Sequence, residues 1–219
     1  MADNIYLFVP NIVDYLRVIL AFVSFYFMPY DPYKAAFCYL LSGLLDAIDG
    51  HLARMLNQGS KFGAMLDMLT DRCTTMCLMA CLCHFYPGWM LFFQFSMAVD
   101  ITSHWFHIQS SMMKGSSSHK VLDLAANPIL RHYYHNKNIL FVMCAANELF
   151  YCMLYMVHFT PGPTLWPLSL GLWELVLYLC TPLALIKLGI SILQLGAASH
   201  NITGIDQEDR EREALNKRQ

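Results

Sequence analysis

Four aspartates stand close together in an otherwise apolar part of the chain, in two pairs separated by a short polar and basic stretch. Residues three or four apart on a helix share a face, so Asp46 and Asp49 are expected on one side of a first helix. By the same rule, Asp67 and Asp71 lie on one side of a second helix. The connection between the two helices is short. We therefore predict antiparallel neighbours whose acidic faces oppose each other.

Carboxylates brought together in this way require cations, because two like charges about 4 Å apart repel by about 4 kcal/mol at an effective dielectric of about 20. Arg54 and Arg72 can offset only part of this charge. Mg²⁺ and Mn²⁺ are hard cations that prefer carboxylate oxygens. We therefore predict a site for two such ions, whose charge would neutralise a diphosphate under attack. Gly50 and Gly63 lack side chains and would let a ligand or another helix approach the backbone.

The aspartates belong to a longer pattern of eight residues at fixed spacing, Asp46-x2-Asp49-Gly50-x2-Ala53-Arg54-x8-Gly63-x3-Asp67-x3-Asp71. This pattern resembles, at every position, the signature of the CDP-alcohol phosphatidyltransferases. The surrounding phrases, LSGLLDAIDGHLAR and FGAMLDMLTDRC, are similar to those of the family members that use inositol as the acceptor alcohol. Similar phrases recur through most of the chain, and the resemblance weakens after Ala197.

The resemblance implies that the phosphatidyl group of CDP-diacylglycerol passes to a hydroxyl of myo-inositol and that CMP is released. It also implies roles for the signature residues. The metal ligands would be Asp46, Asp49, Asp67 and Asp71. Asp71 would in addition accept the proton of the attacking hydroxyl, a contribution of typically about 10²–10⁴-fold in rate. CDP-diacylglycerol would be bound by Gly50, Arg54 and Ser60.

Several polar residues outside the signature are candidates for contacts with inositol or phosphate, and each has two explanations. Charged groups at membrane depth are costly and usually face a bundle interior or a water-filled cavity. In the first apolar segment, Asp14 and Arg17 can form a local ion pair, or Asn11 and Arg17 can face the diphosphate. The others can bind the acceptor, or only bond between helices or to lipid headgroups. The candidates are Asn11, Arg17, Asp100, His104, Lys120 and Arg131.

Composition predicts an all-α, polytopic membrane protein. Of the 219 residues, 57% are hydrophobic and only 14% charged, and the net charge of -2 gives no indication of nucleic-acid binding. The mean hydropathy is +0.40. Six apolar segments each approach the roughly 20 residues that cross about 30 Å of hydrocarbon. They are residues 5–27, 35–56, 62–85, 89–113, 139–159 and 168–195, with a kink expected at Pro182.

We expect these six transmembrane helices to surround a polar cavity in one catalytic domain, residues 1–200, followed by a charged tail, residues 201–219. With six spans, both termini and the acidic motif lie on the side that carries nearly all the basic residues. In the loops on the opposite side, Lys34 is the only basic residue. The positive-inside rule therefore places the termini and the cavity opening on the cytoplasmic side. The family resemblance implies the endoplasmic reticulum membrane and a homodimer.

Other functions are compatible with parts of this pattern. Residue chemistry alone does not select the acceptor, so a CDP-alcohol phosphatidyltransferase acting on glycerol phosphate, serine or choline is the nearest alternative. A cation channel or carrier lined by the aspartates belongs to a different class, but it leaves Gly50, Arg54 and Gly63 without a reason. A polyprenyl transferase also uses aspartates and Mg²⁺, but its two acidic motifs lie much farther apart.

Overall fold

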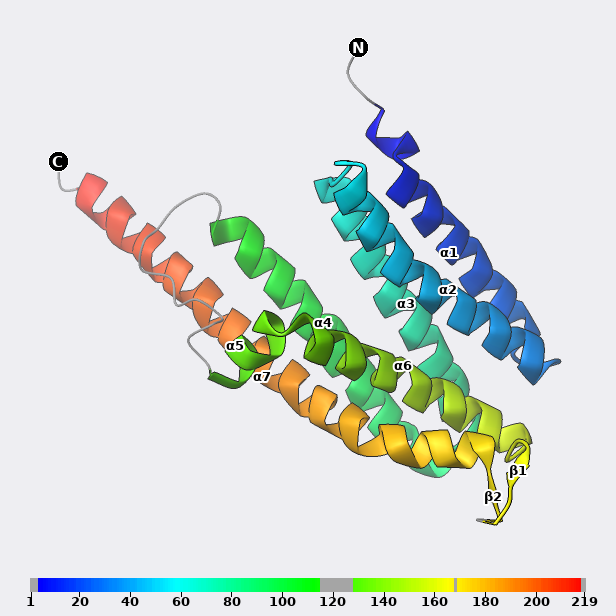
Figure 1. Ribbon diagram of the computed structural model, residues 1–219. Helices are drawn as coiled ribbons and strands as arrows, with labels where there is room; N and C mark the ends of the chain where they lie inside the picture. Colours follow the sequence, from blue (N-terminus) through cyan, green and yellow to red (C-terminus); the bar gives the residue numbers. More distant parts are fainter. Residues whose placement is uncertain (1–3, 115–127, 168, 218–219) are drawn as a thin grey trace. The chain divides into compact units, whose positions relative to one another are not determined.

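The computed structural model describes residues 4–114, 128–167 and 169–217, which are almost entirely helical (Figure 1). The α-helices of these ranges are α1 (Val9–Phe27), α2 (Pro32–Met55), α3 (Lys61–Phe85), α4 (Met90–Lys114), α5 (Pro128–His135), α6 (Lys137–Phe159) and α7 (Leu172–Asn216). Short 3-10 turns cover Ile5–Leu7 and Pro87–Trp89. The chain divides into two compact units, residues 1–94 with 148–181 and residues 95–147 with 182–219.

Helix α1 buries its polar face and exposes its apolar face. Its buried residues recur every three or four positions and include Asn11, Asp14, Arg17, Ala21 and Ser24. Its exposed apolar residues include Ile12, Leu16, Ile19, Phe22 and Tyr26. A surface helix of a soluble protein is arranged the other way round. Hydrocarbon, in contrast, favours an apolar outer surface with polar groups turned inward. The chain is therefore an integral membrane protein, as its composition predicts.

Within the described ranges, three helices are long and apolar enough to cross a membrane by length and composition, namely α1, α6 and α7. Helix α7 has 45 residues, which at 1.5 Å per residue makes it about 68 Å long. This is more than twice the thickness of the hydrocarbon, so part of α7 extends beyond it. Pro182 lies inside α7 without ending it, and the charged segment expected as a tail continues the same helix to Asn216.

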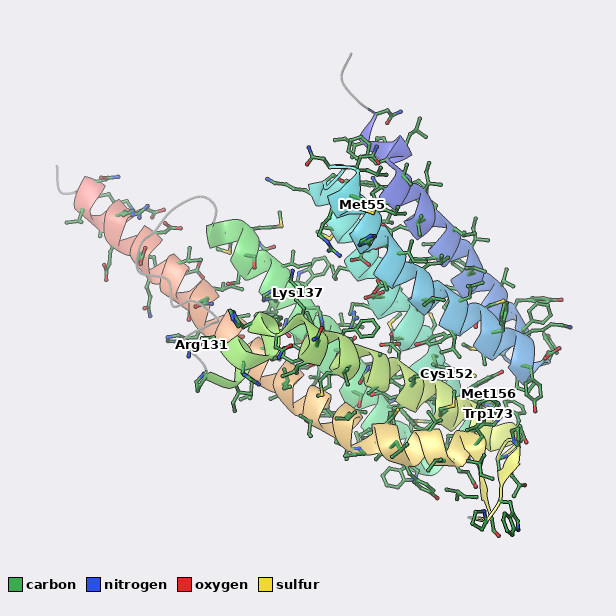
Figure 2. All side chains as sticks on the ribbon, in the orientation of Figure 1. Met55, Arg131, Lys137, Cys152, Met156 and Trp173 are labelled. Carbon is green, nitrogen blue, oxygen red and sulfur yellow. The ribbon has the colours of Figure 1, made fainter. Side chains whose placement is uncertain are left out.

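The connection between α2 and α3 is defined by residues that stop one helix and start the next. Asn57, just after α2, has a φ of +53°, and the Gln58 amide donates to the Ala53 carbonyl at 3.0 Å. These features form a Schellman motif, which satisfies the last carbonyls of a helix. Ser60 then caps α3 by accepting a hydrogen bond from the Gly63 amide at 2.9 Å. Figure 2 shows Met55 at the end of α2, beside this turn.

The N-terminal segment contacts this turn. The Val9 amide donates to Gln58 Oε1 at 2.8 Å, and the ring of Tyr6 meets that of Phe62 edge to face. Helix α1 packs along α2 and also against α3. At the other end of α1, Asp31 is the N-cap of α2. The Lys34 amide donates to Asp31 Oδ1 at 3.1 Å, and this bond lowers the pKa of Asp31.

In the second unit, α5, α6 and α7 share a core of Leu130, Tyr133, Met143 and Ile190. Helix α5 lies in the connection between the predicted apolar segments 89–113 and 139–159, where no helix is predicted. The prediction missed it because its apolar positions span only two turns. A second difference is a small hairpin in the first unit, in which Thr164–Leu165 (β1) pairs antiparallel with Leu170–Gly171 (β2). Helix α7 consequently begins at Leu172 and not at residue 168.

Candidate active site

One guanidinium lies at the centre of the acidic residues of the first unit. Arg17 of α1 is only 1% exposed. Its Nη1 atom is 2.8 Å from Asp14 Oδ1, 2.8 Å from Asp49 Oδ2 and 2.7 Å from Asp67 Oδ1. Nη1 carries two protons, so three carboxylates share them.

The second terminal nitrogen of Arg17 contacts the remaining two signature aspartates. Nη2 is 2.7 Å from Asp46 Oδ1 and donates a hydrogen bond to Asp71 Oδ1. Arg72, the residue after Asp71 on α3, places its own Nη2 3.3 Å from Asp71 Oδ2. The carboxylates of α2 and α3 therefore converge on the same point, as the helical spacing predicts.

Asp14 is an acid of this cluster that sequence reasoning did not count as a metal ligand. The sequence predicts Asp14 only as a partner of Arg17, although its position three residues before Arg17 places both on the same helix face. The guanidinium of Arg17 pairs with Asp14, as one explanation predicts, and also with the signature acids. Its contact with a diphosphate stays a prediction. The cluster thus draws on three helices.

The composition and geometry of the cluster suit hard cations. One buried guanidinium cannot neutralise five carboxylates, and Arg17 Nε is buried with no hydrogen-bond partner among the described residues. In the described part of the chain, two groups of acids have ligand oxygens within 4.8 Å of one another: Asp14, Asp49 and Asp67, and Asp46, Asp67 and Asp71. Asp67 belongs to both groups. Oxygen ligands at such spacing can hold Mg²⁺ or Mn²⁺.

Gly63 allows α1 to approach α3 next to the acids. A Cβ atom at this position would lie 2.5 Å from Asn11 Oδ1 and 3.1 Å from Ser60 Oγ. Asn11 is fully buried, and its Nδ2 donates to the Ile5 carbonyl at 2.6 Å, so its side chain has little freedom to move away. The absence of a side chain at residue 63 is therefore a packing requirement of the site.

We expect Gly63→Ala to lower the stability of the protein by about 1–3 kcal/mol, the usual cost of overpacking. Gly50→Ala is the matched control, because its Cβ would meet only Arg54 Nη1, at 3.7 Å. Alanine there also gains up to about 1 kcal/mol in helix propensity. Thermal unfolding of both variants in detergent measures the difference. Equal melting temperatures would contradict this account of Gly63.

Comparisons with known proteins agree with the signature. A family model described as CDP-alcohol phosphatidyltransferase matches residues 7–122. The human CDP-diacylglycerol–inositol 3-phosphatidyltransferase is 55% identical to this chain, covering 95% of it and 97% of the human protein. This chain belongs to the CDP-alcohol phosphatidyltransferase family. Proteins of the same name from Drosophila melanogaster (44% identical, 95% of this chain and 91% of that protein) and Schizosaccharomyces pombe (42%, 94% and 93%) are also similar. The family predicted from the sequence is confirmed.

The residues predicted to bind CDP-diacylglycerol lie in the C-terminal part of α2 and at the N-cap of α3. Gly50 is on α2, one residue after Asp49. A Cβ atom at this position would come within 4 Å of Arg54 Nη1 only. Arg54 is exposed in the last turn of α2. Ser60, predicted to assist nucleotide binding, has a structural task as the N-cap of α3. Its role toward a nucleotide stays a prediction.

Of the remaining candidates for acceptor contacts, the described residues Asp100, His104 and Arg131 belong to the second unit. His104 Nδ1 lies 2.7 Å from the Asp100 carbonyl oxygen and 3.6 Å from Asp100 Oδ1, within α4. Arg131 is exposed on α5, where Figure 2 shows it. Lys120 lies outside the described residues. Sequence reasoning missed Lys187 of α7, which is 4% exposed and has its Nζ 3.8 Å from Asp100 Oδ1. A lysine inside an apolar segment was the signal that could have revealed it.

Proposed function

We propose that this protein transfers the phosphatidyl group of CDP-diacylglycerol to myo-inositol and releases phosphatidylinositol and CMP. The observation that carries the proposal is the convergence of the four signature aspartates of α2 and α3 on one point next to α1. The human, Drosophila melanogaster and Schizosaccharomyces pombe relatives all have the name of an enzyme that acts on CDP-diacylglycerol and inositol.

The proposed cofactor is a pair of divalent ions, Mg²⁺ or Mn²⁺, with Asp46, Asp49, Asp67 and Asp71 as their ligands. Carboxylate oxygens suit both metals. When bound, the ions supply the positive charge that a diphosphate requires during attack. Asp67 belongs to both groups of converging oxygens, so it would help to hold an ion in either of them.

In the proposed reaction, an inositol hydroxyl forms an O–P bond to the phosphorus on the lipid side of the diphosphate. The bond from this phosphorus to the oxygen of CMP breaks, and CMP leaves with the bonding electrons. Asp71 takes the proton of the hydroxyl, because a sugar hydroxyl is a weak nucleophile unless a base removes its proton during attack. Gly50, Arg54 and Ser60 hold the nucleotide diphosphate, with Arg54 providing charge and Gly50 leaving space.

Contacts to inositol or phosphate are proposed for Asn11, Arg17, Asp100, His104, Lys120 and Arg131. Arg17 has the strongest support, since its guanidinium already lies among the acids that would hold the ions next to the diphosphate. Asn11 has weaker support, because its amide is committed to the Ile5 carbonyl and packs on Gly63.

We further propose six transmembrane helices around a polar cavity that opens to the cytoplasm, with both termini on that side. Helices α2, α3 and α4 would complete the spans, since each has 24 or 25 residues. The catalytic domain would comprise residues 1–200 and the charged tail residues 201–219. The proposed location is the endoplasmic reticulum membrane, where the protein would form a homodimer among membrane lipids.

The test is an acceptor comparison with the purified full-length protein in detergent or nanodiscs. CDP-diacylglycerol and Mn²⁺ are combined with radiolabelled inositol, serine, choline or glycerol 3-phosphate. We expect labelled lipid and an equal amount of CMP with inositol and background with the others. Preference for another acceptor would replace the proposal with a different member of the same family. Nucleotide-independent cation flux in vesicles, without CMP release, would replace it with a channel or carrier.

A further inference from the structure

A carboxylate on α6 joins the two helices that carry the catalytic acids. Glu148 Oε2 accepts a hydrogen bond from Tyr39 Oη of α2 at 2.5 Å and another from Thr75 Oγ1 of α3 at 2.9 Å. All three residues belong to the first unit. Tyr39 is 5% exposed and Thr75 2%. Cys152 and Met156, which follow Glu148 at four-residue intervals on α6 and are labelled in Figure 2, are also buried.

The two hydroxyls lie on the same helix faces as the acids. Tyr39 precedes Asp46 by seven residues, which is two turns of α2, and Thr75 follows Asp71 by four residues on α3. Thr75 Oγ1 is also 3.0 Å from the carbonyl oxygen of Asp71. The Thr75 hydroxyl has a single proton, which can be donated to only one acceptor at a time. Donation to Glu148 therefore takes this hydrogen bond away from the carbonyl oxygen of Asp71.

The carboxyl group of Glu148 lies within a largely apolar helix. Among the described helices, α6 is one of three that are long and apolar enough to span a membrane. Ionisable groups at membrane depth are expensive and are retained for function. Here the cost is offset by the two hydrogen bonds that the carboxyl group accepts from Tyr39 and Thr75. Each bond spans a long stretch of sequence, so it constrains the tertiary arrangement and not a local turn.

We infer that Glu148 is a positioning residue for the phosphatidyl transfer: through Tyr39 and Thr75 it holds α2 and α3 in register, and so holds Asp46 and Asp71 at their working separation. The inference rests on the proposed function. Glu148 acts through hydroxyls that stand next to the acids along their helices. Outer partners of metal-binding and reacting groups typically change affinity or activity by about 10–100-fold when they are removed.

The experiment removes the hydroxyls and leaves Glu148 and all the acids in place. Tyr39→Phe and Thr75→Val are compared with Tyr86→Phe. Tyr86 is the matched control because its hydroxyl also links the end of α3 to α6, by donating to the Leu154 carbonyl at 3.0 Å, but away from the acids. For each variant kcat, the KM for inositol, Mn²⁺ binding by electron paramagnetic resonance and the melting temperature are measured.

We expect Tyr39→Phe and Thr75→Val to lower kcat and weaken Mn²⁺ binding by about 10–100-fold, with little change in the KM for inositol. Thr75→Ser restores the hydroxyl and should recover most of both losses. Tyr86→Phe should change only the melting temperature. If all three variants lose similar stability while kcat and Mn²⁺ binding per folded molecule stay at the wild-type level, Glu148 is a structural residue only and the inference is wrong.

The result for Glu148 can be distinguished from the result for the proposed function. If the wild-type protein prefers another acceptor alcohol, the proposed function fails, and the same comparison made with that acceptor still decides the role of Glu148. If the wild-type protein transfers nothing, Mn²⁺ binding by the variants decides it.

Discussion

Asp71→Asn should reduce kcat for CMP release by about 10²–10⁴-fold, the usual contribution of a positioned base. The amide has the size of the carboxylate and can still accept the hydrogen bond from Arg17 Nη2. It cannot take the proton of the acceptor hydroxyl. The substitution also removes one negative charge from a cluster in which five carboxylates share one buried guanidinium. Stability should therefore stay level or rise while activity falls.

The measurements are CMP release with saturating substrates and thermal unfolding on the same preparation. Asp31→Asn is the control, because it makes the same chemical change at the N-cap of α2, outside the cluster, where asparagine also caps a helix well. It should leave kcat unchanged. Normal CMP release by Asp71→Asn would show that another group accepts the proton.

Asp67→Asn should remove most of the stabilisation that Mn²⁺ gives the protein. A ligand that binds only the folded state stabilises it by about 2.7 kcal/mol at a concentration one hundred times its dissociation constant. Asp67 belongs to both groups of acids that can hold an ion, so its loss should impair both positions. Asp14 and Asp46 each belong to one group. Their asparagine variants should therefore keep part of the effect.

This prediction is checked by following the melting temperature of each variant over a titration with Mn²⁺. Without metal, Asp67→Asn should melt at or above the wild-type temperature, since the substitution relieves repulsion among the acids. With metal, the wild type should rise well above the variant. An equal rise in wild type and Asp67→Asn would show that Asp67 is not a ligand of either ion.

The crowding of the acids explains why both predictions expect stability to be kept or raised while activity or metal binding falls. The acids are held close together at the expense of electrostatic repulsion, and only Arg17 and Arg72 contact them as positive charges in the described part of the chain. Functional sites commonly retain such unfavourable arrangements because the geometry is needed for chemistry. A substitution that neutralises one acid therefore relieves the fold while it disables the site.

Much of the architecture was readable from the sequence because it depends on local rules. Apolar runs bounded by turn residues predict α1, α2, α3, α4 and α6 to within a few residues, whereas α7 continues to Asn216, well beyond the predicted end at residue 195. The three- and four-residue spacing of the aspartates predicts which acids share a face. The turn after Met55 and the start of α3 follow from Asn57 and Ser60, whose side chains favour a helix end and a helix start. These features depend only on residues that are close to one another in the sequence.

Other features depend on which helices meet, and local periodicity does not contain that information. The entry of Asp14 and Arg17 into the acidic cluster, the contact of Asn11 with the space at Gly63, and the bonds of Glu148 all join residues far apart in the chain. Each contact exists because burial of polar groups in an apolar environment is tolerated only when partners are supplied. The positions of most of the long helices, and the grouping of acids that could bind a metal ion, thus followed from the amino-acid sequence alone. Only the tertiary structure decided which side chains complete the site, because a partner on another helix is chosen by packing.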